Sequence, residues 1–199
     1  MSHNTTAVEH HATPTWQGIP TTKFATWLFL ASEVMFFAGL IGAYIVLRSS
    51  APRAWPVVAE VLNVPLVAGN TFILIVSSLT MVRALAAIED GDPRGLRLNL
   101  VATAVLGAIF LSIQYIEWSA LMHEGTTAST DLFGSVFFTL TGFHGLHVLG
   151  GVLMLVYGTS KALRGHFTQD NHRGVELMGL YWHFVDVVWI FLFTIVYLI

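Results

Sequence analysis

Two ionisable residues, His183 and Asp186, interrupt an otherwise apolar segment with the sequence YWHFVDVVWIFLF, residues 181–193. They are three residues apart, so on a helix they share a face and can hydrogen-bond each other or a neighbouring helix. A proton relay or a metal site could use the same residue types. Hydrogen bonding that fixes helix packing is the commoner explanation of such a pair. The two residues alone leave these alternatives open.

A second pair, His144 and His147, lies in the segment TGFHGLHVLGG and also has a spacing of three. Two imidazoles on one helical face could ligate a metal or a haem. A haem normally takes its ligands from opposite helices, however, and a metal ion would need more ligands. Close helix approach with histidines bonding across the contact is the simpler interpretation, because glycine recurs here, at positions 142, 145, 150 and 151.

Two glutamates complete the set of candidate residues. Glu33 lies well inside an apolar run that contains no basic residue, so we expect its carboxyl group to hold a proton for much of the time. It could serve in a proton relay or hydrogen-bond a neighbouring helix. Glu117 ends another apolar run, three residues after Gln114 and next to Trp118. We expect Glu117 to be a solvated or hydrogen-bonded end group.

The composition indicates which elements position these residues. The chain has 199 residues, of which 55% are hydrophobic and 11% charged, whereas a soluble domain has about 25% charged residues. Hydrocarbon leaves no water for loose backbone groups, so apolar runs of about 20 residues predict membrane-spanning helices. The sequence therefore predicts an all-α polytopic membrane protein, a bundle of five transmembrane helices at residues 24–47, 64–82, 98–116, 132–158 and 177–199.

The distribution of lysine and arginine predicts the orientation. An inside amino terminus places seven basic residues inside, namely Lys23, Arg83, Arg94, Arg97, Lys161, Arg164 and Arg173. It leaves only Arg48 and Arg53 outside. Because basic residues favour the cytoplasmic side, we expect residues 1–23 to form a polar cytoplasmic tail and the carboxyl terminus to lie outside. Three histidines of that tail, His3, His10 and His11, are expected to be solvated.

Cysteine is absent, which excludes disulfides, thiolate-held clusters and metal sites built on sulfur. The sequence contains no basic tract that would predict nucleic-acid binding.

Six strings, taken in order, resemble subunit III of the haem-copper cytochrome c oxidases. They cover most of residues 24–199, which we interpret as one five-helix domain. The strings are SEVMFFAGL (32–40), GNTFILIVSSLT (69–80), QYIEW (114–118), GSVFFTLTGFHGLHVLGG (134–151), HFTQDNHRGVE (166–176) and YWHFVDVVWIFLF (181–193).

The resemblance implies an accessory, non-catalytic subunit of a proton-pumping terminal oxidase in the aerobic electron transport chain. In that family haem and copper belong to subunits I and II, and cytochrome c is reached only indirectly. Subunit III packs on subunit I, binds phospholipid, and supports proton uptake and the stability of the catalytic core. Five-helix members occur in bacteria, so the resemblance also implies a prokaryotic plasma membrane.

The same resemblance assigns provisional roles to individual residues. Glu33 matches the family's buried, carbodiimide-sensitive glutamate and is the candidate for proton buffering. The remaining candidates are expected to make contacts in the bundle interior or with lipid headgroups: Glu117, His144, His147, His172, Glu176, Trp182, His183 and Asp186.

One departure from the family concerns its first two helices. Many members have seven helices, and this chain matches the last five, so a wall of the family's lipid cleft would have to come from a small subunit IV or from a neighbouring chain. Subunit III of a quinol oxidase and an accessory subunit of a nitric oxide reductase are the nearest alternatives. The glutamate in SEVMFF favours the cytochrome c branch. A small proton-coupled transporter and a haem-binding membrane anchor are alternatives of different classes.

Overall fold

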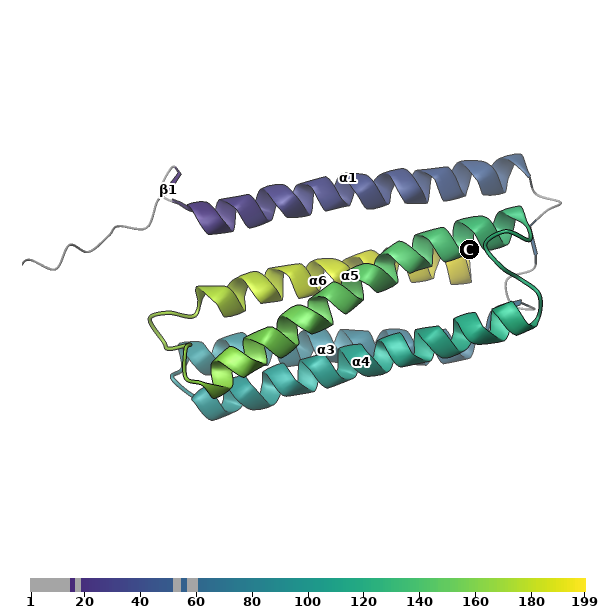
Figure 1. Cartoon of the computed structure of the whole chain (residues 1–199). Helices are drawn as coiled ribbons and strands as arrows, with labels where there is room; N and C mark the ends of the chain where they lie inside the picture. Colours follow the sequence, from purple (N-terminus) through teal and green to yellow (C-terminus); the bar gives the residue numbers. More distant parts are fainter. Residues whose placement is uncertain (1–14, 17–18, 52–54, 57–60) are drawn as a thin grey trace, which may run out of the picture.

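The computed structural model describes residues 15–16, 19–51, 55–56 and 61–199, and its long helices run side by side (Figure 1). Each is long and apolar enough to cross a membrane when α6 is taken together with the short π-helix that continues it. The prediction of five transmembrane helices is therefore confirmed. The helices are α1 (Thr21–Ser50), α3 (Val64–Glu89), α4 (Pro93–His123), α5 (Leu132–Leu163), α6 (Arg173–Phe193) and η2 (Thr194–Leu198).

A small antiparallel strand pair precedes the bundle, formed by β1 (Thr15–Trp16) and β2 (Ile19–Pro20). It lies within the predicted tail, and α1 begins three residues before the expected start at Phe24. Residues 1–14, which include the three tail histidines, lie outside the described residues, as does Arg53.

The helices extend beyond the apolar runs that predicted them. The connector expected at residues 83–97 shrinks to 90–92, because α3 continues to Glu89 and α4 begins at Pro93. The side chain of Asp92 accepts the backbone N–H of Arg94 and so caps α4. Gly91 has a φ of 74°, a left-handed conformation that glycine adopts without strain. The apolar run thus marks the hydrocarbon part of each helix, whereas capping residues set its ends.

The loop between α5 and α6 is fastened to the end of α3. Gln169 Nε2 donates to the carbonyl oxygen of Glu89 at 2.6 Å. His172 Nδ1 donates to the carbonyl oxygen of Gln169 at 2.6 Å, and its Nε2 lies 3.9 Å from Glu89 Oε1. His172 therefore contacts its own loop and the last residue of α3 at one end of the bundle.

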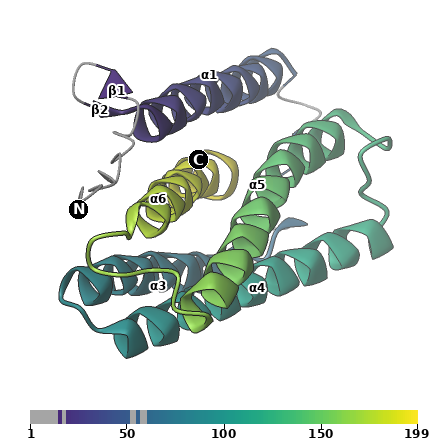
Figure 2. The same ribbon diagram turned by 60° about the vertical axis from the view of Figure 1, so that its left-hand side comes forward.

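The bundle has α6 near its centre, where it packs against α1, α3 and α5, while α3 and α4 form a long hairpin on the side opposite α1 (Figure 2). α1 is the most loosely attached helix. Its buried residues Leu30, Phe37 and Tyr44 are seven apart, so they form one narrow stripe along α1.

Trp182 of α6 lies at the centre of the packing, where two glycines make room for it. A Cβ at Gly107 of α4 would lie 2.5 Å from Trp182 Cη2, and one at Gly151 of α5 would lie 2.8 Å from the same ring. Its indole N–H donates to Ser77 Oγ at 3.0 Å. Trp182 therefore joins α3, α4, α5 and α6 in one contact.

Candidate functional site

Glu33 of α1 and His147 of α5 form a polar contact between two helices. Glu33 Oε2 lies 3.0 Å from His147 Nε2, and both side chains are less than a fifth exposed. His147 Nδ1 lies 2.7 Å from the carbonyl oxygen of Phe143, and Tyr181 Oη donates to the carbonyl oxygen of His147 at 3.0 Å. The contact thus brings together α1, α5 and α6.

The hydrogen-bond partners of His147 limit where a shared proton can lie. A carbonyl oxygen can only accept, so His147 Nδ1 carries the hydrogen that bonds Phe143. His147 Nε2 is then either a bare acceptor or part of an imidazolium. The contact with Glu33 is a hydrogen bond only if one proton lies between them, on the carboxyl group or on the ring. The pair can therefore hold and exchange one proton.

His144 shares a helical face with His147 but has different surroundings. It is 1% exposed and stacks on Trp189, with ring centroids 4.8 Å apart, while the edge of Phe110 faces it. Neither of its ring nitrogens has a hydrogen-bond partner within the described residues. Within the described residues, therefore, His147 contacts a polar group of another helix and His144 does not.

His183 and Asp186 lie together against Ser78 of α3. Ser78 Oγ is 2.8 Å from His183 Nδ1, and the side chain of Asp186 lies near the same hydroxyl group. Asp186 is buried and His183 is half-buried. The two predicted residues thus meet through a serine that the sequence analysis had not singled out.

Glu117 is buried and hydrogen-bonded on two sides. Its Oε2 accepts from Gln114 Nε2 at 2.8 Å and from Tyr197 Oη at 2.9 Å. Tyr197 lies in η2, far along the chain from Glu117. The sequence placed Gln114 on the same helical face but was wrong to expect Glu117 at a helix end, because α4 continues to His123. It contained no signal for Tyr197.

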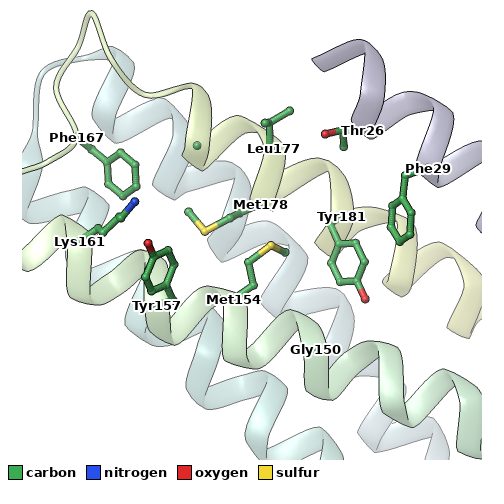
Figure 3. Close-up of a pocket in the computed structure, with 11 residues that line it drawn as sticks. Thr26, Phe29, Gly150, Met154, Tyr157, Lys161, Phe167, Leu177, Met178 and Tyr181 are labelled. Atoms are coloured by element: carbon green, nitrogen blue, oxygen red, sulfur yellow. The ribbon is translucent and has the colours of Figure 1, made fainter. Parts of the chain in front are cut away.

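A cavity of about 550 Å³ lies between α1, α5 and α6 (Figure 3). Lys161 and Tyr157 lie at one end, with Lys161 Nζ 4.8 Å from the centroid of the Tyr157 ring. Tyr181 and Phe29 stack at the other end, with ring centroids 6.4 Å apart. The cavity is therefore apolar along its length and cationic at one end. Its other lining residues are Thr26, Gly150, Met154, Phe167, Gly174, Leu177 and Met178.

An ion pair joins the first turns of α1 and α6, on the same side of the bundle. Lys23 Nζ contacts Glu176 Oε1, and both side chains are about one-third exposed. Sequence reasoning had assigned Glu176 to interior or headgroup contacts without a partner. Within the described residues, no three histidine, aspartate or glutamate side chains gather in a way that could hold a metal ion.

The comparison with known proteins assigns the family. The family model for cytochrome c oxidase subunit III matches residues 1–199. The chain belongs to this family. It is 41% identical over 174 residues to a probable cytochrome c oxidase subunit 3 of Nocardia farcinica, an alignment that covers 87% of this chain and 86% of the relative. It is 42% identical over 191 residues to the cytochrome c oxidase subunit 3 of a Synechocystis species. That alignment covers 96% of this chain and 78% of the relative.

Membership of the cytochrome c oxidase subunit III family confirms the resemblance found in the six strings. The chain is a multi-pass membrane protein and an accessory subunit of a terminal oxidase, and it belongs to a complex with other oxidase subunits. This family favours the oxidase hypothesis over the transporter and the haem-binding anchor.

Proposed function

We propose that this chain is the non-catalytic subunit III of a proton-pumping cytochrome c oxidase in a prokaryotic plasma membrane. It packs on subunit I, while subunits I and II hold the haem and copper and receive electrons that originate from cytochrome c. The observation that carries this proposal is the family match over residues 1–199, together with bacterial relatives whose printed names specify cytochrome c oxidase. Residues 24–199 are the subunit III domain, and residues 1–23, which end in the first turn of α1, lie on the cytoplasmic side.

The cavity shown in Figure 3 supports the proposal that this chain binds phospholipid. Its lining is mostly aromatic and aliphatic, as an acyl chain requires, and Lys161 lies where a phosphate group could meet a cation. The ion pair of Lys23 and Glu176 lies at the same end of the bundle. A lipid with its tail between α1 and α6 and its phosphate at Lys161 fits this distribution.

The contact between Glu33 and His147 supports the proposal that this chain buffers protons for the complex. The two side chains lie 3.0 Å apart, close enough to share a proton, and are partly exposed on the surface of the bundle. With one proton the pair carries no net charge, and release of that proton leaves one negative charge, which a position facing a partner subunit or water accommodates better than hydrocarbon does. This arrangement suits a reservoir that supports proton uptake elsewhere in the complex.

Copurification tests the proposal directly. An affinity tag on this chain, with extraction in a mild detergent, should recover subunits I and II, haem and copper, and cytochrome c oxidase activity. A complex that oxidises quinol and not cytochrome c would assign the chain to the quinol oxidase branch instead. Recovery of the chain without any oxidase subunit would overturn the proposal.

A further inference from the structure

Three polar residues form a patch near the middle of the membrane-spanning segments, on the side of the bundle where α3 and α6 meet. We call Ser78, His183 and Asp186 the midplane patch. His183 follows Arg173, the first residue of α6, by ten positions, or about 15 Å along a helix. Ser78 precedes Glu89, the last residue of α3, by eleven positions. Hydrocarbon is about 30 Å thick, so the patch lies near its centre.

Exposed apolar side chains surround the midplane patch on both helices. On α3, Ile75 and Val82 are 44% and 52% exposed, and they lie three positions before and four positions after Ser78. On α6, Val187 lies four positions after His183 and is 50% exposed. Side chains at these spacings share a helical face with the patch. The outer surface formed by α3 and α6 is therefore polar at the midplane patch and apolar around it.

The patch has hydrogen-bonding capacity that the chain itself leaves unused. Ser78 occupies Nδ1 of His183, and within the described residues no hydrogen bond uses the other ring nitrogen of His183. Lipid tails cannot supply a donor or an acceptor, so polar groups at this depth normally face a protein or a water-filled space. A half-buried histidine at the centre of an apolar outer surface thus indicates a protein partner.

A shallow apolar cavity lies beside the patch, between α6 and α1. Its volume is about 210 Å³, and Val187 and Phe184 of α6 and Val34, Ala38 and Ile41 of α1 are among its lining residues. Val187 therefore borders both the cavity and the midplane patch. The cavity is large enough to receive an apolar side chain from a neighbouring helix that crosses this surface.

We propose that the midplane patch and its apolar rim dock a transmembrane helix of another oxidase subunit, which presents a hydrogen-bonding side chain to His183 at mid-membrane depth. This inference rests on the proposed function and specifies a surface through which the chain joins its complex. Polar side chains that bond across helices inside a membrane favour one partner and one register over lipid. The apolar rim supplies the packing, and the cavity beside Val187 receives a side chain of the docked helix.

Crosslinking in the assembled complex tests this surface. Because the chain contains no cysteine, Val187→Cys introduces one thiol for a photoactivated maleimide–benzophenone reagent. Leu153→Cys is the matched control, since Leu153 is also exposed but lies on α5. We expect several-fold more adduct with another oxidase subunit from position 187 than from position 153. Equal yields at both positions, adducts with lipid alone at position 187, or adducts with a second copy of this chain would overturn the inference.

Two substitutions of His183 test the polar centre of the surface. In the Val187→Cys background, His183→Gln keeps a side chain that can bond Ser78 and the partner, and the subunit adduct should persist. His183→Leu should lower the adduct yield by about threefold to tenfold, the effect of one hydrogen bond between membrane helices. An undiminished yield from His183→Leu would contradict the proposal.

Two further measurements distinguish the loss of the docking contact from misfolding of the variant and from failure of the proposed function. The resistance of the isolated His183→Leu chain to unfolding in SDS shows whether the bundle itself is intact. Copurification of the unsubstituted chain with subunits I and II tests the proposed function. If the unsubstituted chain copurifies with subunits I and II but position 187 crosslinks only to lipid, the docking surface is wrong and the proposed function stands. If it does not copurify, the proposed function fails first.

Discussion

The imidazole of His147 lies 3.0 Å from the carboxyl group of Glu33, and this contact attaches α1 to α5. Besides further polar and aromatic contacts to α5, α6 and η2, α1 contributes one stripe of three buried side chains to the bundle. One of them, Phe37, makes an edge-to-face contact with His147, with ring centroids 5.0 Å apart. A polar contact and an aromatic contact therefore meet where the most loosely packed helix joins the bundle.

Replacing Glu33 should weaken the attachment of α1. We expect Glu33→Leu to lower the free energy of unfolding by about 1–3 kcal/mol, because it leaves the ring nitrogen of His147 without its partner. Glu33→Gln can still hydrogen-bond His147 and should cost less. SDS titration of the purified chain, followed by helicity, measures both. In a double-mutant cycle with His147→Leu, strictly additive losses would show that the two side chains are not coupled.

Filling the space at Gly151 should disturb Trp182. A methyl group at this position would lie 2.8 Å from the indole ring, so Gly151→Ala should lower the free energy of unfolding by about 1–3 kcal/mol. Gly39→Ala is the control, because nothing lies within 4 Å of that position. The same SDS titration compares the two variants. Equal stability of both would mean that Trp182 does not pack against Gly151 as described.

Removing the charge of Lys161 should reduce phospholipid binding. A lysine near a lipid phosphate contributes about 1 kcal/mol, or roughly a fivefold change in occupancy. Lys161→Gln should therefore retain several-fold less phospholipid after detergent extraction, measured by mass spectrometry of the purified complex. Arg164→Gln is the matched control, because Arg164 is exposed and does not line the cavity. An equal loss of lipid in both variants would argue against a site at Lys161.

Single cysteines should reveal the orientation of the bundle. With an inside amino terminus, the loop after α3 lies inside and the loop between α4 and α5 lies outside. In intact cells a membrane-impermeant maleimide should label Ser129→Cys and leave Asp90→Cys unlabelled until the membrane is permeabilised. Both positions are exposed, and the chain offers no competing thiol. The opposite pattern would reverse the predicted topology.

Local sequence patterns predicted much of the fold. The five apolar runs located the transmembrane helices, since hydrocarbon permits only backbone structures that satisfy their own hydrogen bonds. The same patterns were less accurate at the helix ends. The residue at which α4 begins depends on the capping side chain of Asp92 and not on hydropathy. The spacing of Gln114 and Glu117 placed them on one helical face, where the structure has them hydrogen-bonded.

The sequence by itself determined the class of protein, the five spans and which ionisable residues lie at membrane depth. Only the tertiary structure decided what those residues contact. His147 meets Glu33 across 114 positions of the chain, and Tyr197 meets Glu117 across 80. His144, on the same face as His147, stacks instead on Trp189. Helical periodicity assigns each side chain to a face, but the helix that covers that face depends on how distant segments pack together.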